Sequence, residues 1–207
     1  MPTFVTPGPI AAGSSLAAHL AYSSVHADGP LGQCELHLAT GQVQLDRLDA
    51  LQANVSAGEV ATGHIAGRAD IKGGAFAIRI GEAEGPVGLS SSDGRAWIGH
   101  AAADLDLRSG RGDFDIDRAD GSVTATTASG AIRVGRLTAG PAKLTNGSGD
   151  IEVGIGEGTA ADLDVNSERG AVRNSVPSPE NPASSDNRVA VHARTRHGDI
   201  IIHPAAS

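Results

Sequence analysis

Apolar residues recur along the chain in pairs that stand at a fixed distance after a corner residue, usually glycine. The second and fourth residues after each corner are apolar, with Thr62 and Asn174 as the exceptions. Successive corners are separated by 18, 17, 16, 20, 18, 18, 19, 21 and 28 residues. Alternation with a period of two predicts short β-strands with one buried face. The corners are Ser23, Gly41, Gly58, Gly74, Gly94, Gly112, Gly130, Gly149, Gly170 and Gly198.

A second apolar pair stands seven and five residues before each corner, as Leu105 and Leu107 do before Gly112. Gly67 is the single exception to this second rule. Each repeat therefore contains two short strands joined at a corner, where glycine supplies the backbone conformation of a tight turn. We predict an all-β fold, a single β-solenoid or β-helix of about nine to ten coils with two strands per coil.

The period alone also fits an antiparallel β-sandwich built from repeated hairpins. The outward residues three positions after the corner favour parallel stacking, because Asp115, Arg133, Glu152 and Arg173 alternate in charge. They would form a ladder if equivalent strands of successive coils lie side by side, about 4.8 Å apart. A hairpin would instead bring Asp115 beside Asp106 or Thr124, without such a match.

The predicted solenoid domain covers residues 16–204. Residues 1–15, with three prolines, predict an N-terminal arm or cap, and residues 205–207 a short tail. The longest insertion, 175–190, carries Pro177, Pro179 and Pro182 and predicts a surface loop. A stack of coils leaves an open strand edge at each end, which favours association unless it is covered.

Charge and composition exclude some classes of partner. The 207 residues include 16 Lys and Arg against 24 Asp and Glu, a net charge of −8, and only five aromatic residues. A phosphate backbone or an anionic membrane surface requires the opposite sign, and single-stranded nucleic acid requires aromatic stacking platforms. We therefore expect no nucleic acid and no membrane as partner.

The compartment follows from the start of the chain and from its cysteine content. No apolar run approaches the roughly 20 residues of a membrane span. Pro2, Pro7 and Pro9 interrupt the beginning, and the first basic residue is Arg47, so no signal peptide is predicted. The single cysteine, Cys34, fits a reducing compartment, and a cytoplasmic location is expected.

No group of residues predicts catalysis, and no cofactor is expected. His192, His197 and His203 are close in sequence, but the pattern places them on different strands and in a corner, so they do not predict a metal triad. Cys34 stands at an inward position, where a small buried hydrophobe is the expected role. The chain is therefore not expected to be an enzyme.

Three aspartates are weak candidates for a calcium site built from oxygen ligands: Asp113, Asp115 and Asp150. The nonapeptide repeat of calcium-binding β-rolls does not recur in the chain. A solvated acidic face with arginines nearby is the favoured interpretation, and no metal is predicted.

Runs such as TASGAIRVGRL, NGSGDIEVG and HGDIII, together with the N-terminal MPTFVTPGPIAA, carry a resemblance to a known family. The sequence resembles the bacterial β-strand-repeat family DUF4097, whose members carry an adhesin label. The similarity is strongest from about Gly94 to Val172. It implies a β-solenoid-like all-β fold and brings no catalytic motif.

Trp97 is predicted to point away from the core, beside Asp115 of the next coil. Exposed tryptophans often anchor interfaces, although a loop or cap could also cover this one. Our first hypothesis is a non-enzymatic scaffold that presents a strand-ladder face to a protein partner or to copies of itself. The partner-face candidates are Trp97, Asp115, Arg133, Glu152 and Arg173. The alternative is a protein that binds or processes a small molecule or glycan under the 175–190 loop.

Overall fold

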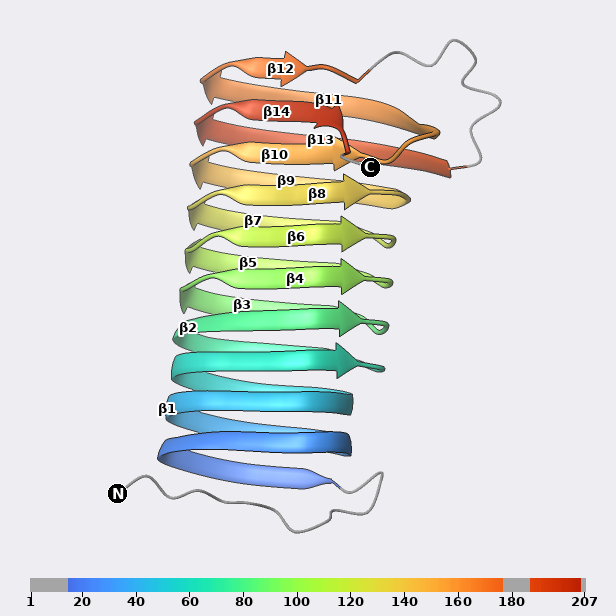
Figure 1. Ribbon diagram of the computed structural model, residues 1–207. Helices are drawn as coiled ribbons and strands as arrows, with labels where there is room; N and C mark the ends of the chain where they lie inside the picture. The colour runs from blue at the N-terminus through green and yellow to red at the C-terminus, as the bar shows by residue number, and fades with distance from the viewer. Residues whose placement is uncertain (1–14, 177–186, 206–207) are drawn as a thin grey trace.

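The computed structural model describes residues 15–176 and 187–205. Within these ranges the chain forms an all-β parallel solenoid with a coil count close to the prediction (Figure 1). Every strand pairing in the described residues is parallel. Phe114 pairs with Ile132 of the next coil rather than across a hairpin with Val123. Parallel stacking is thus confirmed, and the sandwich of hairpins is excluded.

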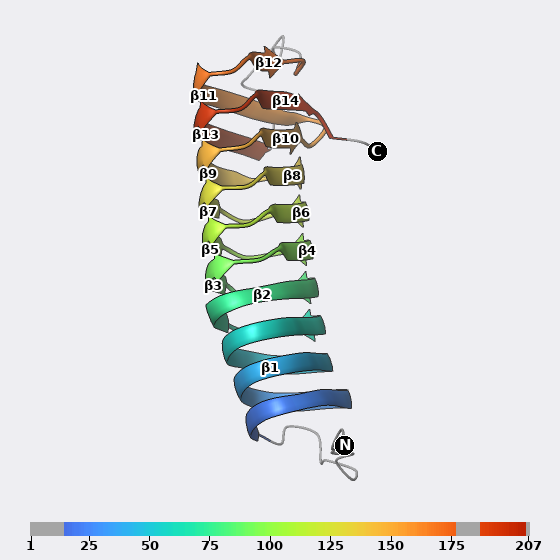
Figure 2. The ribbon, with the colours of Figure 1, turned by 90° about the vertical axis from the view of Figure 1, so that its left-hand side faces the viewer.

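The strands form two rows that face each other across a narrow interior (Figure 2). β1 (Leu16–Ile65) winds without interruption through the first coils, and β2 (Ala69–Ala83) contributes to both rows. One row continues through β3, β5, β7, β9, β13 and β11, and the other through β4, β6, β8, β10, β14 and β12. These strands are β3 (Val87–Asp93), β4 (Ala96–Ala101), β5 (Leu105–Arg111), β6 (Phe114–Ala119), β7 (Val123–Ser129), β8 (Ile132–Leu137), β9 (Gly140–Ser148), β10 (Ile151–Ile155), β11 (Thr159–Arg169), β12 (Val172–Asn174), β13 (Asn187–His197) and β14 (Ile200–Pro204).

One aliphatic core runs between the rows. Ile116, Val134 and Val153 occupy equivalent positions on consecutive coils and belong to one buried cluster. Nearly all of this core is Val, Ile, Leu and Ala. At roughly 1.5–3 kcal/mol for each fully buried large aliphatic side chain, this burial is the main favourable term in folding.

The corner predicted at Gly74 is displaced by two residues. Val60 pairs with Ile78, and Ile78 pairs with Ala96, so the residue equivalent to Gly58 and Gly94 is Phe76. The coil is then 18 residues long on both sides of this corner, instead of 16 and 20. The inward pair before the corner becomes Ala69 and Ile71, both buried, and the exception at Gly67 disappears.

The corners stack backbone against backbone. Gly130 has a φ of 142°, and a Cβ there would collide with the carbonyl oxygen of Gly112 on the preceding coil. Glycine is required at this corner for both reasons. We expect the other stacked corner glycines to be constrained in the same way.

Buried polar side chains lie beneath the later corners. Thr127 Oγ1 donates to the carbonyl oxygen of Gly112 at 3.2 Å, and Asn146 Nδ2 donates to that of Gly130 at 2.6 Å. Thr195 repeats the contact one coil further on, with its Oγ1 3.2 Å from the Gly149 oxygen. This buried polar position, three residues before the corner, was not predicted from the sequence. These bonds satisfy carbonyl groups that the corner would otherwise bury unpaired.

The last coil of the chain is inserted into the stack instead of being placed at its end. β13 pairs with β9 on one side and β11 on the other, and β14 lies between β10 and β12 (Figure 1). The expected neighbour of Glu152 was Arg173, and this expectation is wrong, because Ile201 lies between them. The outermost coil is therefore β11 and β12.

The predicted arm, loop and tail meet the described residues only in part. Residues 1–14, 177–186 and 206–207 lie outside them. Residues 187–190, predicted as part of the loop, belong to β13. Ala205, predicted as the first residue of the tail, is buried, and its N–H donates to the carbonyl oxygen of Ile155 at 2.8 Å.

Candidate interaction face

Four of the predicted partner-face residues stand in register on consecutive strands. Trp97 on β4 pairs with Asp115 on β6, which pairs with Arg133 on β8, which pairs with Glu152 on β10. Parallel pairing of equivalent strands places these side chains about 4.8 Å apart along the stack. We call these four residues the ladder face.

The charged members of the ladder face bind one another. Arg133 Nε donates to Glu152 Oε2 at 2.8 Å, and its Nη1 lies 3.4 Å from Asp115 Oδ1. His203 Nε2 lies 3.1 Å from the other carboxylate oxygen of Glu152. The hydrogen bond from Arg133 lowers the pKa of Glu152 below its ordinary value. Because these side chains are partly exposed, each ion pair contributes about 0–1 kcal/mol.

Trp97 is half-buried on this face. The guanidinium carbon of Arg79, on the neighbouring strand, lies 6.0 Å from the centre of the Trp97 ring. The ring also leans over Gly99, where an added Cβ would stand 3.1 Å from Trp97 Cη2. Trp97 therefore presents an aromatic surface that its neighbours hold in place.

A groove of about 320 Å³ opens beside Trp97. Gly63 and Gly81 line it at outward positions, where side chains would otherwise fill the space. Its other lining residues include Asp28, Asp46 and Arg79. The sequence carried a signal that we did not use, because Gly63, Gly81, Gly99, Gly135 and Gly154 each stand five residues after a corner once Phe76 is taken as one.

A second charged cluster was not predicted. Asp120 accepts hydrogen bonds from Arg118 Nε at 2.9 Å and Thr138 Oγ1 at 2.6 Å, and His100 Nε2 lies 2.8 Å from it. Partial burial raises the pKa of Asp120, but these hydrogen bonds outweigh it and hold the pKa well below its usual range. Glu82 lies on the other side of His100, at 3.3 Å. The cluster ties consecutive coils together through a carboxylate that is fully engaged.

The aspartates considered as metal ligands are hydrogen-bonded within the protein. Asp113 Oδ1 accepts the N–H of Ala131 at 2.9 Å, which is the main cause of its lowered pKa. Asp150 Oδ1 accepts the N–H of Asp199 on the inserted coil at 2.8 Å. Asp115 lies against Arg133, as described above. Across residues 15–176 and 187–205, no three His, Cys, Asp or Glu side chains gather in a way that could hold a metal ion.

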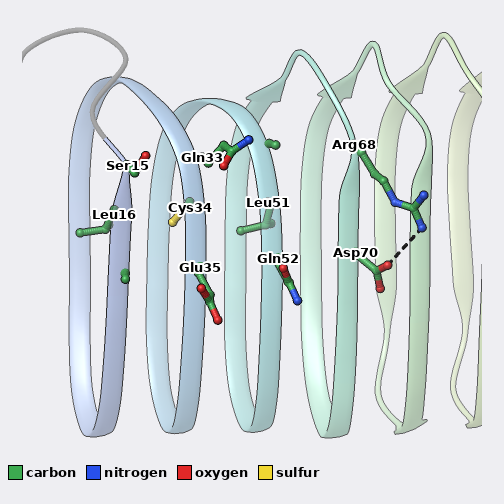
Figure 3. A pocket seen from close by; sticks show the side chains of 11 residues that line it. Ser15, Leu16, Gln33, Cys34, Glu35, Leu51, Gln52, Arg68 and Asp70 are labelled. Atoms are coloured by element: carbon green, nitrogen blue, oxygen red, sulfur yellow. Dashed lines mark hydrogen bonds and ion pairs between the residues drawn. The ribbon is translucent and has the colours of Figure 1, made fainter.

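A second groove lies at the beginning of the solenoid. It has a volume of about 430 Å³, runs across the first coils, and is lined by polar side chains together with Leu16, Cys34 and Leu51 (Figure 3). Arg68 Nη2 donates to Asp70 Oδ2 at 3.2 Å along its wall. The polar side chains that line it are Ser15, Gln33, Glu35, Gln52, Arg68 and Asp70. These hydroxyl, amide, carboxylate and guanidinium groups can form hydrogen bonds with a polar ligand.

The family is established by a family model described as Toastrack DUF4097, which matches residues 28–203. The chain belongs to the Toastrack family. This confirms the resemblance read from the sequence, with the adhesin label as an addition that the match does not support. No curated protein and no solved structure matches the chain. The Toastrack fold is compatible with a scaffold or interaction role.

The remaining candidates of this Toastrack chain occupy separate places. Arg173 lies on the outermost coil, with its Nη2 3.7 Å from Asp199 Oδ2. His192 on β13 pairs with Asp164 on β11 at 3.3 Å, in the row opposite the one that carries the His203 contact to Glu152. Cys34 is buried as predicted, and burial raises the pKa of its thiol to about 11. In the part of the chain that the structure describes, no helix is of a length and apolarity to span a membrane.

Proposed function

We propose that this Toastrack protein is a non-enzymatic scaffold that presents the ladder face to a protein partner. The observation that carries the proposal is the alignment of Trp97 with Asp115, Arg133 and Glu152 on strands held in register. A stack of parallel strands keeps these side chains in place without a cost of ordering at the moment of binding.

The two kinds of residue contribute differently. Trp97 is half-buried beside an open groove and is the anchor of the proposed contact. Tryptophan is among the few residue types whose truncation to alanine removes much of the binding energy of an interface. The alternating charges are already paired with each other, so they select a partner with the complementary order of charges rather than add much affinity. The expected partner surface inserts a side chain into the groove beside Trp97 and sets an acidic group near Arg133.

Site-specific photo-crosslinking tests this function. A photoreactive residue at position 115 should capture a partner in cells, and Trp97→Ala should reduce the yield. The matched control is a photoreactive residue at position 124, on β7 of the opposite row. Equal capture from both positions, or capture that Trp97→Ala leaves unchanged, would show that the ladder face is not the binding surface.

A second candidate function is the binding of a small polar molecule. Support for it comes from the groove at the first coils rather than from the 175–190 loop, of which residues 177–186 lie outside the described range. Glu35→Ala should then abolish a thermal shift produced by a polyol or amine ligand that wild type shows. If no ligand of these classes shifts the melting temperature of wild type, the candidate is lost. A cytoplasmic location also stays a prediction, which the reduced, buried Cys34 fits.

A further inference from the structure

Within residues 15–176 and 187–205, the first coil and the β11–β12 coil each have a neighbouring coil on one side only. On the first coil, Leu16 and Val25 point inward but are only half-buried, whereas Cys34 and Val43 one coil further in are almost fully buried. The outermost coil repeats this condition, since Leu163 and Val165 are half-buried and Val172 is 45% exposed. Tyr22, which is 83% exposed, and Val172 are the exposed large hydrophobic residues of the described chain, one at each end.

We propose that the β11–β12 end of one copy stacks on the first coil of a second copy, so that the parallel sheets continue from molecule to molecule. The occupant of each open end is therefore the opposite end of the same protein. This inference does not depend on the ladder face, because it uses the ends of the stack and not its side.

The backbone is prepared for this contact. In the described residues β11 pairs only with β13, and β12 only with β14, so each strand presents one unpaired edge. The first turn of β1 presents the opposite edge at the other end of the stack (Figure 1). Only head-to-tail stacking reproduces the parallel pairing found inside the molecule. Such a contact does not close on itself and builds a linear assembly.

The side chains fit when the corner at Gly170 is aligned with the corner at position 23. The inward positions then match apolar residues with apolar residues, and Arg169 lies opposite the exposed Tyr22. Asp164 and Glu168 lie opposite Ala17 and Ala21, so neither meets a like charge. The apolar pairs are Leu163 with Leu16, Val165 with Ala18, and Val172 with Val25.

The polar groups of the two ends agree with the same alignment. In this alignment Arg173 lies opposite His26 and diagonal to Asp28 of the second copy. Within the first coil, His26 Nε2 lies 2.9 Å from Asp28 Oδ1. Protective devices that block sheet edges, such as inward charges or prolines, are missing from the inward positions of residues 16–25 and 163–174. Asn174 is the polar exception, and it stands at the rim next to Ser175.

Disulfide trapping tests the alignment. The full-length double variant Tyr22→Cys and Arg169→Cys should form a ladder of covalent multimers when oxidised with diamide, because neighbouring parallel strands bring the two Cα atoms within disulfide range. Native Cys34 is buried and does not compete. The control pair, Ala17→Cys with Arg169→Cys, uses two exposed positions that the alignment separates by five residues along the strands, about 17 Å, and should give no ladder.

Sedimentation velocity of the full chain gives the second readout. Wild type should show elongated multimers that grow with concentration, and Val172→Asp should raise the apparent dissociation constant by about tenfold or more, because a charge would be buried in the contact. Thr126→Asp adds the same charge at an exposed position of β7, in the middle of the stack, and should leave association unchanged. A wild type that stays monomeric at every concentration, a ladder from the control pair, or an unaffected Val172→Asp overturns the proposal.

Trp97→Ala separates this inference from the proposed function. The multimer ladder should persist in that variant, even if capture of a partner is lost. If Trp97→Ala abolishes self-association, copies meet through the ladder face and the end-to-end contact is wrong.

Discussion

Thr62 offers a sharp test of how polar groups are treated inside the solenoid. Its side chain occupies an inward position opposite Ile80 and is 4% exposed. Among the described residues its Oγ1 finds no hydrogen-bond partner. Leaving a buried hydroxyl unpaired costs about 1–3 kcal/mol. Thr62→Val keeps the shape of the side chain and removes that cost, so the free energy of unfolding should rise by about 1–3 kcal/mol.

The same substitution at Thr127 should have the opposite sign. Thr127 Oγ1 lies 3.2 Å from the carbonyl oxygens of both Gly112 and Ser129 and shares its one proton between them. Thr127→Val leaves the Gly112 carbonyl at a buried corner without this donor, and the free energy of unfolding should fall by about 1–3 kcal/mol. Thr126→Val, at the exposed position next to it, should change stability by less than about 0.5 kcal/mol.

The assay must resolve single coils, because a stack of repeats can open locally. Amide hydrogen exchange at Ile80 and its neighbours should slow in Thr62→Val, and exchange near Gly112 should accelerate in Thr127→Val. In thermal melts each kcal/mol should appear as a shift of about 2–4 °C. If Thr62→Val is no more stable than wild type while Thr127→Val is destabilised, the unpaired hydroxyl of Thr62 does not destabilise the fold, and the prediction is wrong.

Three further outcomes follow from the contacts. Gly130→Ala should lower the melting temperature by several degrees, because the new Cβ meets the Gly112 carbonyl oxygen and alanine rarely adopts a φ of 142°. Circular dichroism against Gly88→Ala measures the difference, because φ is not positive there and the added Cβ would meet no atom closer than 3.9 Å. The thiol of native Cys34 should resist a thiol reagent at pH 8. Because its folded pKa of about 11 exceeds the unfolded value of about 9, the free energy of unfolding should fall as pH rises from 9 to 11. Cys34→Ala should not show this loss. Asp120 has a lowered folded pKa, so its contribution is present above the ordinary carboxyl pKa of about 4 and is lost as pH falls further; urea unfolding of Asp120→Asn and wild type should therefore converge in strong acid.

The sequence was sufficient for the parallel stack because two independent patterns agreed. The period of two marked the inward residues, and the alternation of Asp115, Arg133 and Glu152 indicated which strands are neighbours. The charge pattern distinguished parallel stacking from a sandwich of hairpins, because the alternation of inward apolar residues fits both folds.

The corner near Phe76 was misplaced for a local reason. Gly73 and Gly74 look like a corner, whereas Gly73 lies opposite Val55 and Ser91 within the strand row. Glycine is required at position 73 because a side chain would collide with the carbonyl oxygen of Val55, and not because the chain turns there. The residue type alone cannot distinguish a glycine at a turn from a glycine at a close approach of two strands. A constant coil length of 18 residues, counted from Gly58 or from Gly94, would have placed the corner at Phe76.

The site was predictable only where it follows from the register. Trp97, Asp115, Arg133 and Glu152 fall into line because each is three residues after a corner. The groove beside Trp97 was missed, since it arises from absent side chains at Gly63 and Gly81. The Asp120 cluster was missed because it lies where the strand enters an arc of variable length.

The inverted order of the last two coils follows from their inward residues. If β11 and β12 stacked directly on β9 and β10, Asn174 would face Val153, and Ile202 would lie on the outer coil. The inserted order instead buries Ile202 completely and leaves Asn174 at the rim, where its Oδ1 accepts the N–H of Val176 at 2.9 Å.

Free energies of this order decide the arrangement. Burying an isoleucine gains about 1.5–3 kcal/mol, and an unpaired buried amide costs about 1–3 kcal/mol, so both effects favour insertion. Asp199 adds a bond that the sequential order lacks, because its carboxylate accepts the N–H of Ala171 at 2.8 Å while its own N–H binds Asp150. The more polar coil is thus placed outermost, yet it still exposes Val172. The proposed contact between copies would bury this valine against Val25 of a second copy, a gain that the isolated stack does not provide.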